Sequence, residues 1–294
     1  MLNLDTITLL TKQYSKPIFY TGTSTDSTST VLTRSRLQKQ NDIKMDINKL
    51  TADFAVVSQD TLLVCYGFYS CMVELVSSQT GEVLSQLELE GVPMRVCLVG
   101  RDRAVVTLET KPQVELIKIK GNTIAKDKLL KLHDKASGIT TSGNNLVVSY
   151  CMHPWLEVIS IDGKVLKRFH STGKKQHFAL PEFITTLPDG TLWVSDQGNG
   201  TITKMDVNLT ILQTFTMPLL EYPFGITAVT EDEILVCSER NNSLVLLQPS
   251  TNTMSTLLGE DDGIKAPYSL TYCPQERKIY VTNDNNNINV FKVI

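Results

Sequence analysis

Histidine and cysteine side chains are common metal ligands, and this 294-residue chain has four histidines and six cysteines. The histidines are His133, His153, His170 and His177, and the cysteines are Cys65, Cys71, Cys97, Cys151, Cys237 and Cys273. The sequence contains no Cys-x-x-Cys pair and no closely spaced Cys/His set of the kind that zinc sites require. We therefore expect reduced thiols, no metal and no cofactor.

The stretch "NDNNNIN", residues 283–289, is a candidate for calcium binding because it is rich in side-chain oxygens. It lacks the spaced carboxylates and the closing glutamate of a calcium-binding loop. Asn and Asp adopt left-handed backbone conformations readily and hydrogen-bond their own turns. We interpret this stretch as a turn.

Acid–base or nucleophilic chemistry would need an activated carboxylate, hydroxyl or thiol. Asp196 is one candidate, and the others are six small residues that each follow a valine: Cys65, Thr107, Ser149, Ser195, Cys237 and Thr282. The chain has neither a Gly-x-Ser-x-Gly elbow nor a Walker loop. We expect Asp196 to accept hydrogen bonds from a turn and the small residues to allow close packing. From the sequence we therefore expect that this chain is not an enzyme.

The six small residues mark a repeat of 42 to 46 residues. Each lies in an apolar run, which a polar turn joins to a second alternating run, as in "LWVSDQGNGTITKM" and "IYVTNDNNNINVFK". A further run precedes each pair, often after a proline (Pro93, Pro181, Pro223 and Pro267), and a fourth follows. Four short strands per 42 to 46 residues are typical of a β-propeller blade.

The predicted fold is therefore all-β, a six-bladed propeller of four-stranded antiparallel blades over residues 42–294. The last repeat ends after its third strand, so an N-terminal strand must close the ring. The alternating segment "DIKMDIN", residues 42–48, is the predicted closing strand. Residues 1–41 include the polar run "TGTSTDSTST" and are expected to be a polar linker or the end of a helical region absent from this chain.

Composition narrows the environment and the partners. The formal net charge is −3 and 41% of the residues are hydrophobic, so nothing global favours DNA or RNA. No apolar run reaches the roughly 20 residues of a membrane helix. The N-terminus is a poor secretory signal because it lacks a basic start. We expect a cytoplasmic protein without membrane contact.

The segment "PDGTLWVSDQGNGTITKMD" resembles an NHL repeat, in which Asp-Gly, an apolar pair, Val, Ser, Asp, Asn and Ile recur at set positions. Residues 42–294 are similar to the C-terminal NHL-type propeller of tripartite-motif proteins. The resemblance implies the recognition module of a ubiquitin ligase, or an RNA-binding module. The chain itself lacks RING and B-box zinc motifs, so we do not expect it to transfer ubiquitin.

The loops that enter each first strand, and those that join the second and third strands, emerge on one side of a propeller, here called the loop face. Its aromatic members and a neighbouring histidine are the predicted protein-binding residues: Phe68, Tyr69, His153, Trp155, Tyr222, Phe224 and Tyr268. Aromatic residues are frequent hot spots of protein interfaces. The favoured function is non-enzymatic binding of a protein or peptide. These aromatic side chains are either exposed or packed under a neighbouring blade.

Single-stranded RNA binding on the loop face is the alternative function. Its predicted residues are Arg95, Lys174, Lys175, His177 and Arg240. Basic and acidic residues nearly balance on the loop face, whereas an RNA-binding surface is mostly basic. A metal-dependent hydrolase in the central channel is the third hypothesis, and it would need ligands that converge from several blades.

Overall fold

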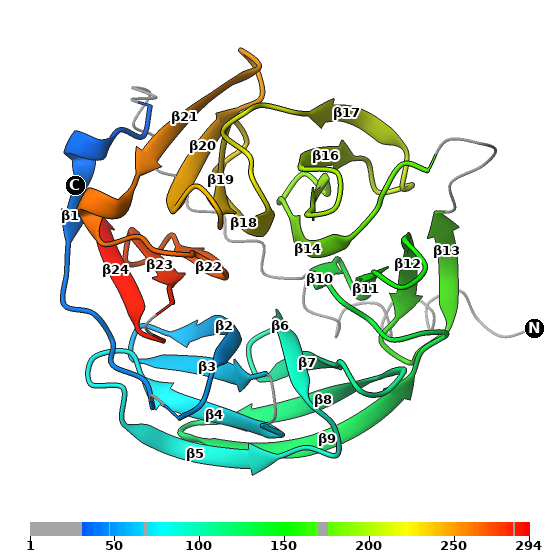
Figure 1. Ribbon diagram of the computed structural model, residues 1–294. Helices are drawn as coiled ribbons and strands as arrows, with labels where there is room; N and C mark the ends of the chain where they lie inside the picture. Colours follow the sequence, from blue (N-terminus) through cyan, green and yellow to red (C-terminus); the bar gives the residue numbers. More distant parts are fainter. Residues whose placement is uncertain (1–30, 47, 68–69, 170–175, 285) are drawn as a thin grey trace, which may run out of the picture.

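The chain forms a ring of six four-stranded antiparallel sheets, as predicted (Figure 1). The computed structural model describes residues 31–46, 48–67, 70–169, 176–284 and 286–294. Sheets that are consecutive in the chain are neighbours in space, so each sheet is one blade. The first strands, β2, β6, β10, β14, β18 and β22, surround the central channel (Figure 1).

Five blades are continuous in sequence. Blade one contains β2 (Thr51–Ser58), β3 (Thr61–Tyr66), β4 (Met72–Ser77) and β5 (Val83–Glu88). Blade two contains β6 (Pro93–Val99), β7 (Arg103–Leu108), β8 (Gln113–Lys120) and β9 (Thr123–Lys131). Blade three contains β10 (Ile139–Ser142), β11 (Asn145–Tyr150), β12 (Trp155–Ser160) and β13 (Val165–Phe169). Blade four contains β14 (Pro181–Thr186), β15 (Leu192–Asp196), β16 (Thr201–Met205) and β17 (Ile211–Phe215). Blade five contains β18 (Pro223–Thr230), β19 (Glu233–Ser238), β20 (Ser243–Gln248) and β21 (Thr253–Leu258).

Blade six joins the two ends of the described chain. It contains β22 (Leu270–Cys273), β23 (Lys278–Thr282), β24 (Ile288–Val293) and the N-terminal β1 (Leu37–Lys39). β1 pairs antiparallel with β24, with Leu37 opposite Val293 (Figure 1). Ring closure by an N-terminal strand is therefore confirmed.

The closing strand lies earlier in the chain than the predicted segment 42–48. Ile43 forms a single bridge with Ile288, and both Ile43 and Met45 are buried in a cluster shared by blades one and six. Their alternation reflects burial between two blades, and β1 is too short to show a strand pattern of its own. The ring also extends N-terminally beyond residue 42, because Leu32 is buried among residues of blades five and six.

Each blade buries both of its faces against its neighbours. β3 is buried along its whole length, whereas the outer strand β13 is mostly exposed. Leu63 of blade one packs in the same cluster as Val106 of blade two. Burial on both faces explains why the inner strands are apolar at nearly every position. None of the helices formed by the described residues has the length and hydropathy that crossing a bilayer requires.

Candidate functional site

The first strands bring six chemically different residues to equivalent positions around the channel. In each blade, one residue of the first strand pairs with the valine that precedes the small residue of the repeat. The equivalent position is the residue immediately before this pairing residue. In blade order the six residues are Asp53, Arg95, Gly138, Phe183, Gly225 and Ser269. The two glycines let adjacent blades approach closely, because a Cβ on Gly225 would lie 2.8 Å from the backbone nitrogen of Leu270.

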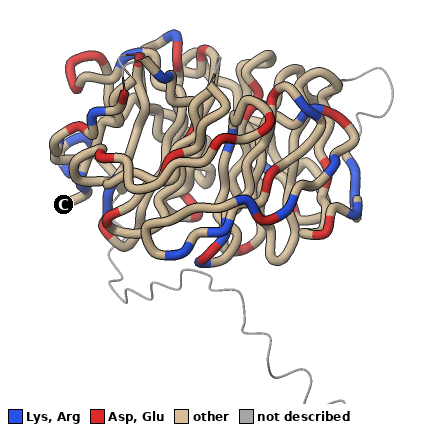
Figure 2. Tube along the Cα trace, turned by 90° about the horizontal axis from the view of Figure 1, so that it is seen from below, with Lys and Arg blue, Asp and Glu red and all other residues tan. Residues whose placement is uncertain are grey.

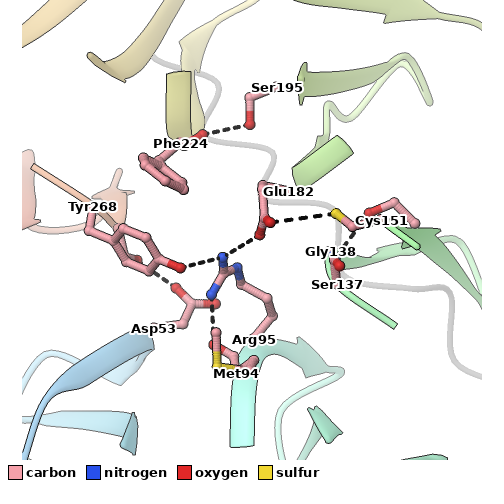
Figure 3. A network of polar contacts seen from close by, with 12 residues as sticks. Asp53, Met94, Arg95, Ser137, Gly138, Cys151, Glu182, Ser195, Phe224 and Tyr268 are labelled. Atoms are coloured by element: carbon pink, nitrogen blue, oxygen red, sulfur yellow. Dashed lines mark hydrogen bonds and ion pairs between the residues drawn. The ribbon is translucent and has the colours of Figure 1, made fainter. Parts of the chain in front are cut away.

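Arg95 crosses the channel and joins three alternate blades (Figure 3). Its side chain extends from blade two and donates hydrogen bonds to Glu182 Oε2 of blade four at 2.8 Å and to Tyr268 Oη of blade six at 2.9 Å. It also donates to the carbonyl oxygen of Met94 at 3.2 Å. Arg95 is only 2% exposed, so the guanidinium side of this ion pair is shielded from solvent.

Two aromatic rings lie over the guanidinium group, and a third packs beside them. The Arg95 Cζ atom lies 3.9 Å from the centre of the Phe183 ring and 5.0 Å from that of Tyr268. Phe224 packs against Tyr268 with ring centres 4.5 Å apart. Phe224 and Tyr268 are half-buried, so part of each ring surface reaches solvent.

We name Arg95, Glu182, Phe183, Phe224 and Tyr268 the channel-mouth cluster. These residues lie close to the starts of first strands, which places the cluster at the loop-face end of the channel. Pro93, Pro181 and Pro223 begin their strands as predicted, whereas Pro267 lies in the loop before β22, which begins at Leu270. Proline at the first position of a strand removes a backbone N–H where the ladder does not need one.

A buried carboxylate lies beside the cluster. Asp53 accepts hydrogen bonds from the backbone nitrogen of Val96 at 2.9 Å and from Ser269 Oγ at 2.5 Å, which links blades one, two and six. Desolvation raises the pKa of Asp53, and the charge of Arg95 partly opposes this rise. Asp53 was not predicted from the sequence, because a single Asp in an apolar strand gives no periodic signal.

The thiol and the phenol beside Arg95 are poor acids. Burial raises the pKa of Cys151, and the nearby charge of Glu182 adds to the rise. Burial also raises the pKa of Tyr268, although Arg95 opposes it. Both groups therefore stay protonated at neutral pH, and Cys151 is not an activated nucleophile.

The small residues of the repeat hold neighbouring blades together. All six are buried, as predicted, and three of the hydroxyl groups donate a hydrogen bond to the next blade. Ser149 donates to the carbonyl of Pro181 at 2.7 Å, Ser195 to that of Phe224 at 2.6 Å and Thr107 to that of Ser137 at 3.3 Å. Their role is therefore inter-blade hydrogen bonding as well as close packing.

Asp196 holds the loop that enters β14. Its carboxylate is fully buried and accepts hydrogen bonds from the backbone nitrogens of Ala179 and Leu180, each at 2.8 Å. It also accepts bonds from the backbone of Gly198 and from Asn199 Nδ2. The predicted role of Asp196 in its turn is confirmed.

Trp155 belongs to a separate group on blade three. Its ring lies 5.5 Å from His133, 5.9 Å from Tyr150 and 5.7 Å from His153, measured between ring centres, and Arg168 approaches one face at 5.1 Å. Trp155 is half-buried, so it is partly packed against its own blade. His153 is exposed and its Nδ1 lies 2.6 Å from Asp134 Oδ2.

Some of the other predicted binding residues lie together on the loop face, and others do not. Tyr222 stacks with Arg240, one member of each predicted set, on the loop face beside Phe224. Arg95 differs from its predicted role, because its guanidinium group is buried and paired with Glu182 instead of being free for phosphate. His177 lies beside Phe169, with ring centres 5.9 Å apart. Phe68, Tyr69, Lys174 and Lys175 lie outside the described residues.

Among the described residues, no group of three or more His, Cys, Asp or Glu side chains is placed to hold a metal ion. Of the three described histidines, His133 and His153 lie at blade three and His177 lies in the loop before β14. Asn283 and Asn289 hydrogen-bond each other at 2.7 Å, and Asn286 accepts a bond from Thr51 at 2.7 Å. The Asn-rich stretch therefore ties its turn to blade one.

The fold is shared with solved propellers of low sequence identity. Virginiamycin B lyase from Staphylococcus aureus, as a catalytically inactive variant with quinupristin, has a TM-score of 0.63 at 15% identity and covers 88% of this chain and 99% of its own. The WD40 β-propeller domain of Doa1 has a TM-score of 0.64 at 12% identity, with 87% and 97% covered. The β-propeller domain of Cps50 (Swd1) from Myceliophthora thermophila has a TM-score of 0.62 at 13% identity, with 83% and 82% covered. At these identities the likeness shows the fold alone.

Family comparison does not support the finer resemblance. No protein-family model matches the chain, and no curated protein matches its sequence. The comparisons therefore establish a six-bladed β-propeller without assigning it to the NHL or tripartite-motif families.

Proposed function

We propose that this chain is a non-enzymatic recognition module that binds a protein or peptide segment on its loop face. The observation that carries the proposal is the channel-mouth cluster, in which half-buried Tyr268 lies over a charge-compensated guanidinium group and half-buried Phe224 packs against Tyr268. Aromatic residues in well-packed surroundings are frequent hot spots of protein interfaces.

The polar contacts of Arg95 favour binding over turnover. Its guanidinium group is held by Glu182 and Tyr268 of the same chain, so these three side chains form a rigid base for the proposed binding site. The raised pKa of Cys151 argues against a nucleophilic role for the thiol beside these side chains. A partner side chain that packs on Phe224 and Tyr268 would gain apolar burial without having to order the site first.

The proposed biological setting is the cytoplasm, as the substrate-recognition part of a ubiquitin ligase of the tripartite-motif type. The support is the NHL-like segment at residues 188–206, together with the buried Asp196, whose hydrogen bonds give a structural reason for the repeat's Asp. Ligase activity would have to come from zinc-binding domains outside this chain.

Single-stranded RNA is the alternative ligand, and two observations make it less favourable. Arg95 has no free fork for a phosphate, and basic and acidic residues are interspersed in the side view of the ring (Figure 2). Phosphate contacts supply much of the affinity of RNA-binding proteins and require a mostly basic surface.

The test is selection of a phage-displayed random dodecapeptide library on the purified protein. Clones should bind the wild type, lose binding to Phe224→Ala, and keep binding to Arg101→Ala, which alters an exposed residue in the β6–β7 turn on the opposite face. Failure to enrich any clone, or equal binding by all three proteins, would refute loop-face recognition. Binding of a random 12-nucleotide RNA pool that weakens steeply with salt would favour the alternative.

A further inference from the structure

An exposed arginine lies beside the channel-mouth cluster, and stacking on a tyrosine holds it in place. The Arg240 Cζ atom is 3.6 Å from the centre of the Tyr222 ring. None of the ion pairs among the described residues involves Arg240, although Glu221 and Glu239 are close to it in sequence. Its guanidinium donors therefore remain available on the loop face.

The backbone beneath this pair is strained and fixed. Tyr222 has a φ of 53°, a left-handed conformation that is costly for a bulky residue. Its carbonyl accepts a hydrogen bond from the backbone nitrogen of Glu239 at 3.2 Å, and Ser238 Oγ bonds both the nitrogen and the carbonyl of Glu221. Such strain persists only where the surroundings impose it, and it is frequent at functional sites.

The strained residue also sets the distance to the channel mouth. Tyr222 precedes Phe224 by two residues, so their Cα atoms are at most about 7 Å apart. Two residues of an extended peptide span about the same length. One extended segment can therefore contact Phe224 and Arg240 together.

We propose that the Arg240–Tyr222 pair binds the carboxylate of an acidic residue in the partner, close to an apolar or aromatic residue that packs on Phe224 and Tyr268. This inference rests on the proposed function and specifies its ligand. A planar guanidinium group fixed on an aromatic ring loses little entropy on binding and matches a carboxylate in bidentate geometry.

The surrounding charges select a single carboxylate over a polyphosphate. Glu221 is exposed, and Glu260 contacts Asn242 two residues from Arg240, so the guanidinium group lies among acidic neighbours. A chain with one negative charge per nucleotide would be repelled by these residues, whereas one carboxylate can pair with Arg240. This is the reason for choosing a peptide over RNA as the occupant.

The test uses the same random dodecapeptide library on the wild type and on Arg240→Gln, with Arg240→Lys and Arg101→Gln as controls. Wild type and Arg101→Gln should enrich peptides that combine an aromatic or large apolar residue with Asp or Glu within about three positions. Arg240→Gln should keep the aromatic preference and lose the acidic one. Arg240→Lys should retain part of the acidic preference, because it keeps the charge without the planar fork.

Affinity of one selected peptide then measures the pairing directly. Arg240→Gln should weaken its binding about tenfold. The same substitution should leave the affinity of the peptide's Glu→Gln analogue unchanged, because the pairing partner is already absent. Enrichment without an acidic preference would overturn this inference and leave the proposed function standing. If no peptide is enriched, or if Arg240→Gln instead abolishes salt-dependent RNA binding, both proposals fail.

Discussion

Replacement of Arg95 by methionine tests how far the channel network supports the ring. The substitution removes the hydrogen bonds to Glu182, Tyr268 and the carbonyl of Met94, and it leaves Glu182 without its cation. Breaking a buried ion pair costs about 3–5 kcal/mol. The Glu182 side chain is 20% exposed, so water can reach it, and we take the lower end, about 3 kcal/mol.

The assay is thermal unfolding followed by circular dichroism or calorimetry. A loss of about 3 kcal/mol corresponds to a fall of about 6–9 °C in the melting temperature, at roughly 2–3 °C per kcal/mol for a domain of this size. The double variant Arg95→Met/Glu182→Gln should be less destabilised than Arg95→Met, because it leaves no unpaired carboxylate at position 182. A melting temperature of Arg95→Met within 1 °C of wild type would refute this account of the network.

The penalty should also depend on pH. The folded-state pKa of Asp53 is raised above its unfolded value, so its contribution to stability falls as pH rises through the folded pKa. Arg95 lowers this pKa, and its removal should raise it further and make ionised Asp53 more costly. The loss of stability in Arg95→Met should therefore be larger at pH 8 than at pH 5, and the opposite trend would contradict the assignment.

Three further predictions concern the contacts that stabilise the propeller. Asp196→Ala should destabilise the fold by about 3 kcal/mol, because several backbone donors lose a buried acceptor; an unchanged chemical-denaturation midpoint would contradict this. Ser149→Ala should cost about 1–3 kcal/mol by the same assay, since its hydroxyl bonds two blades, and a neutral effect would assign it to packing alone. Deletion of residues 1–39 should lower stability relative to deletion of residues 1–30 by about 2 kcal/mol or more, from the loss of buried Leu32 and of β1; equal melting would place the closing strand elsewhere.

The fold was predictable because the repeat is long and its spacing is regular. Six small residues at 42- to 46-residue intervals fix the blade count, and period-two alternation fixes the strands. The closing strand was misplaced because β1 has three residues and no apolar alternation, whereas Ile43 and Met45 alternate for a different reason. Burial between blades and pairing within a blade give the same local pattern.

The candidate site was only partly predictable. Phe224 and Tyr268 were found as loop-face aromatics, but the sequence could not show that Arg95 reaches Glu182, 87 residues away. Such a contact depends on the curvature of the ring, which brings alternate blades to one channel. Asp53 and Glu182 have no local feature that distinguishes them from surface carboxylates.

Hydrogen exchange of the protein with and without a selected peptide tests the central claim most directly. The account predicts that the peptide slows exchange in residues 221–225, 239–242 and 266–269, which lie on the loop face. It predicts no change in the turns at residues 100–102, 188–190 and 231–232, which lie on the opposite face. Protection confined to those opposite turns or to the outer strands would contradict recognition at the channel mouth.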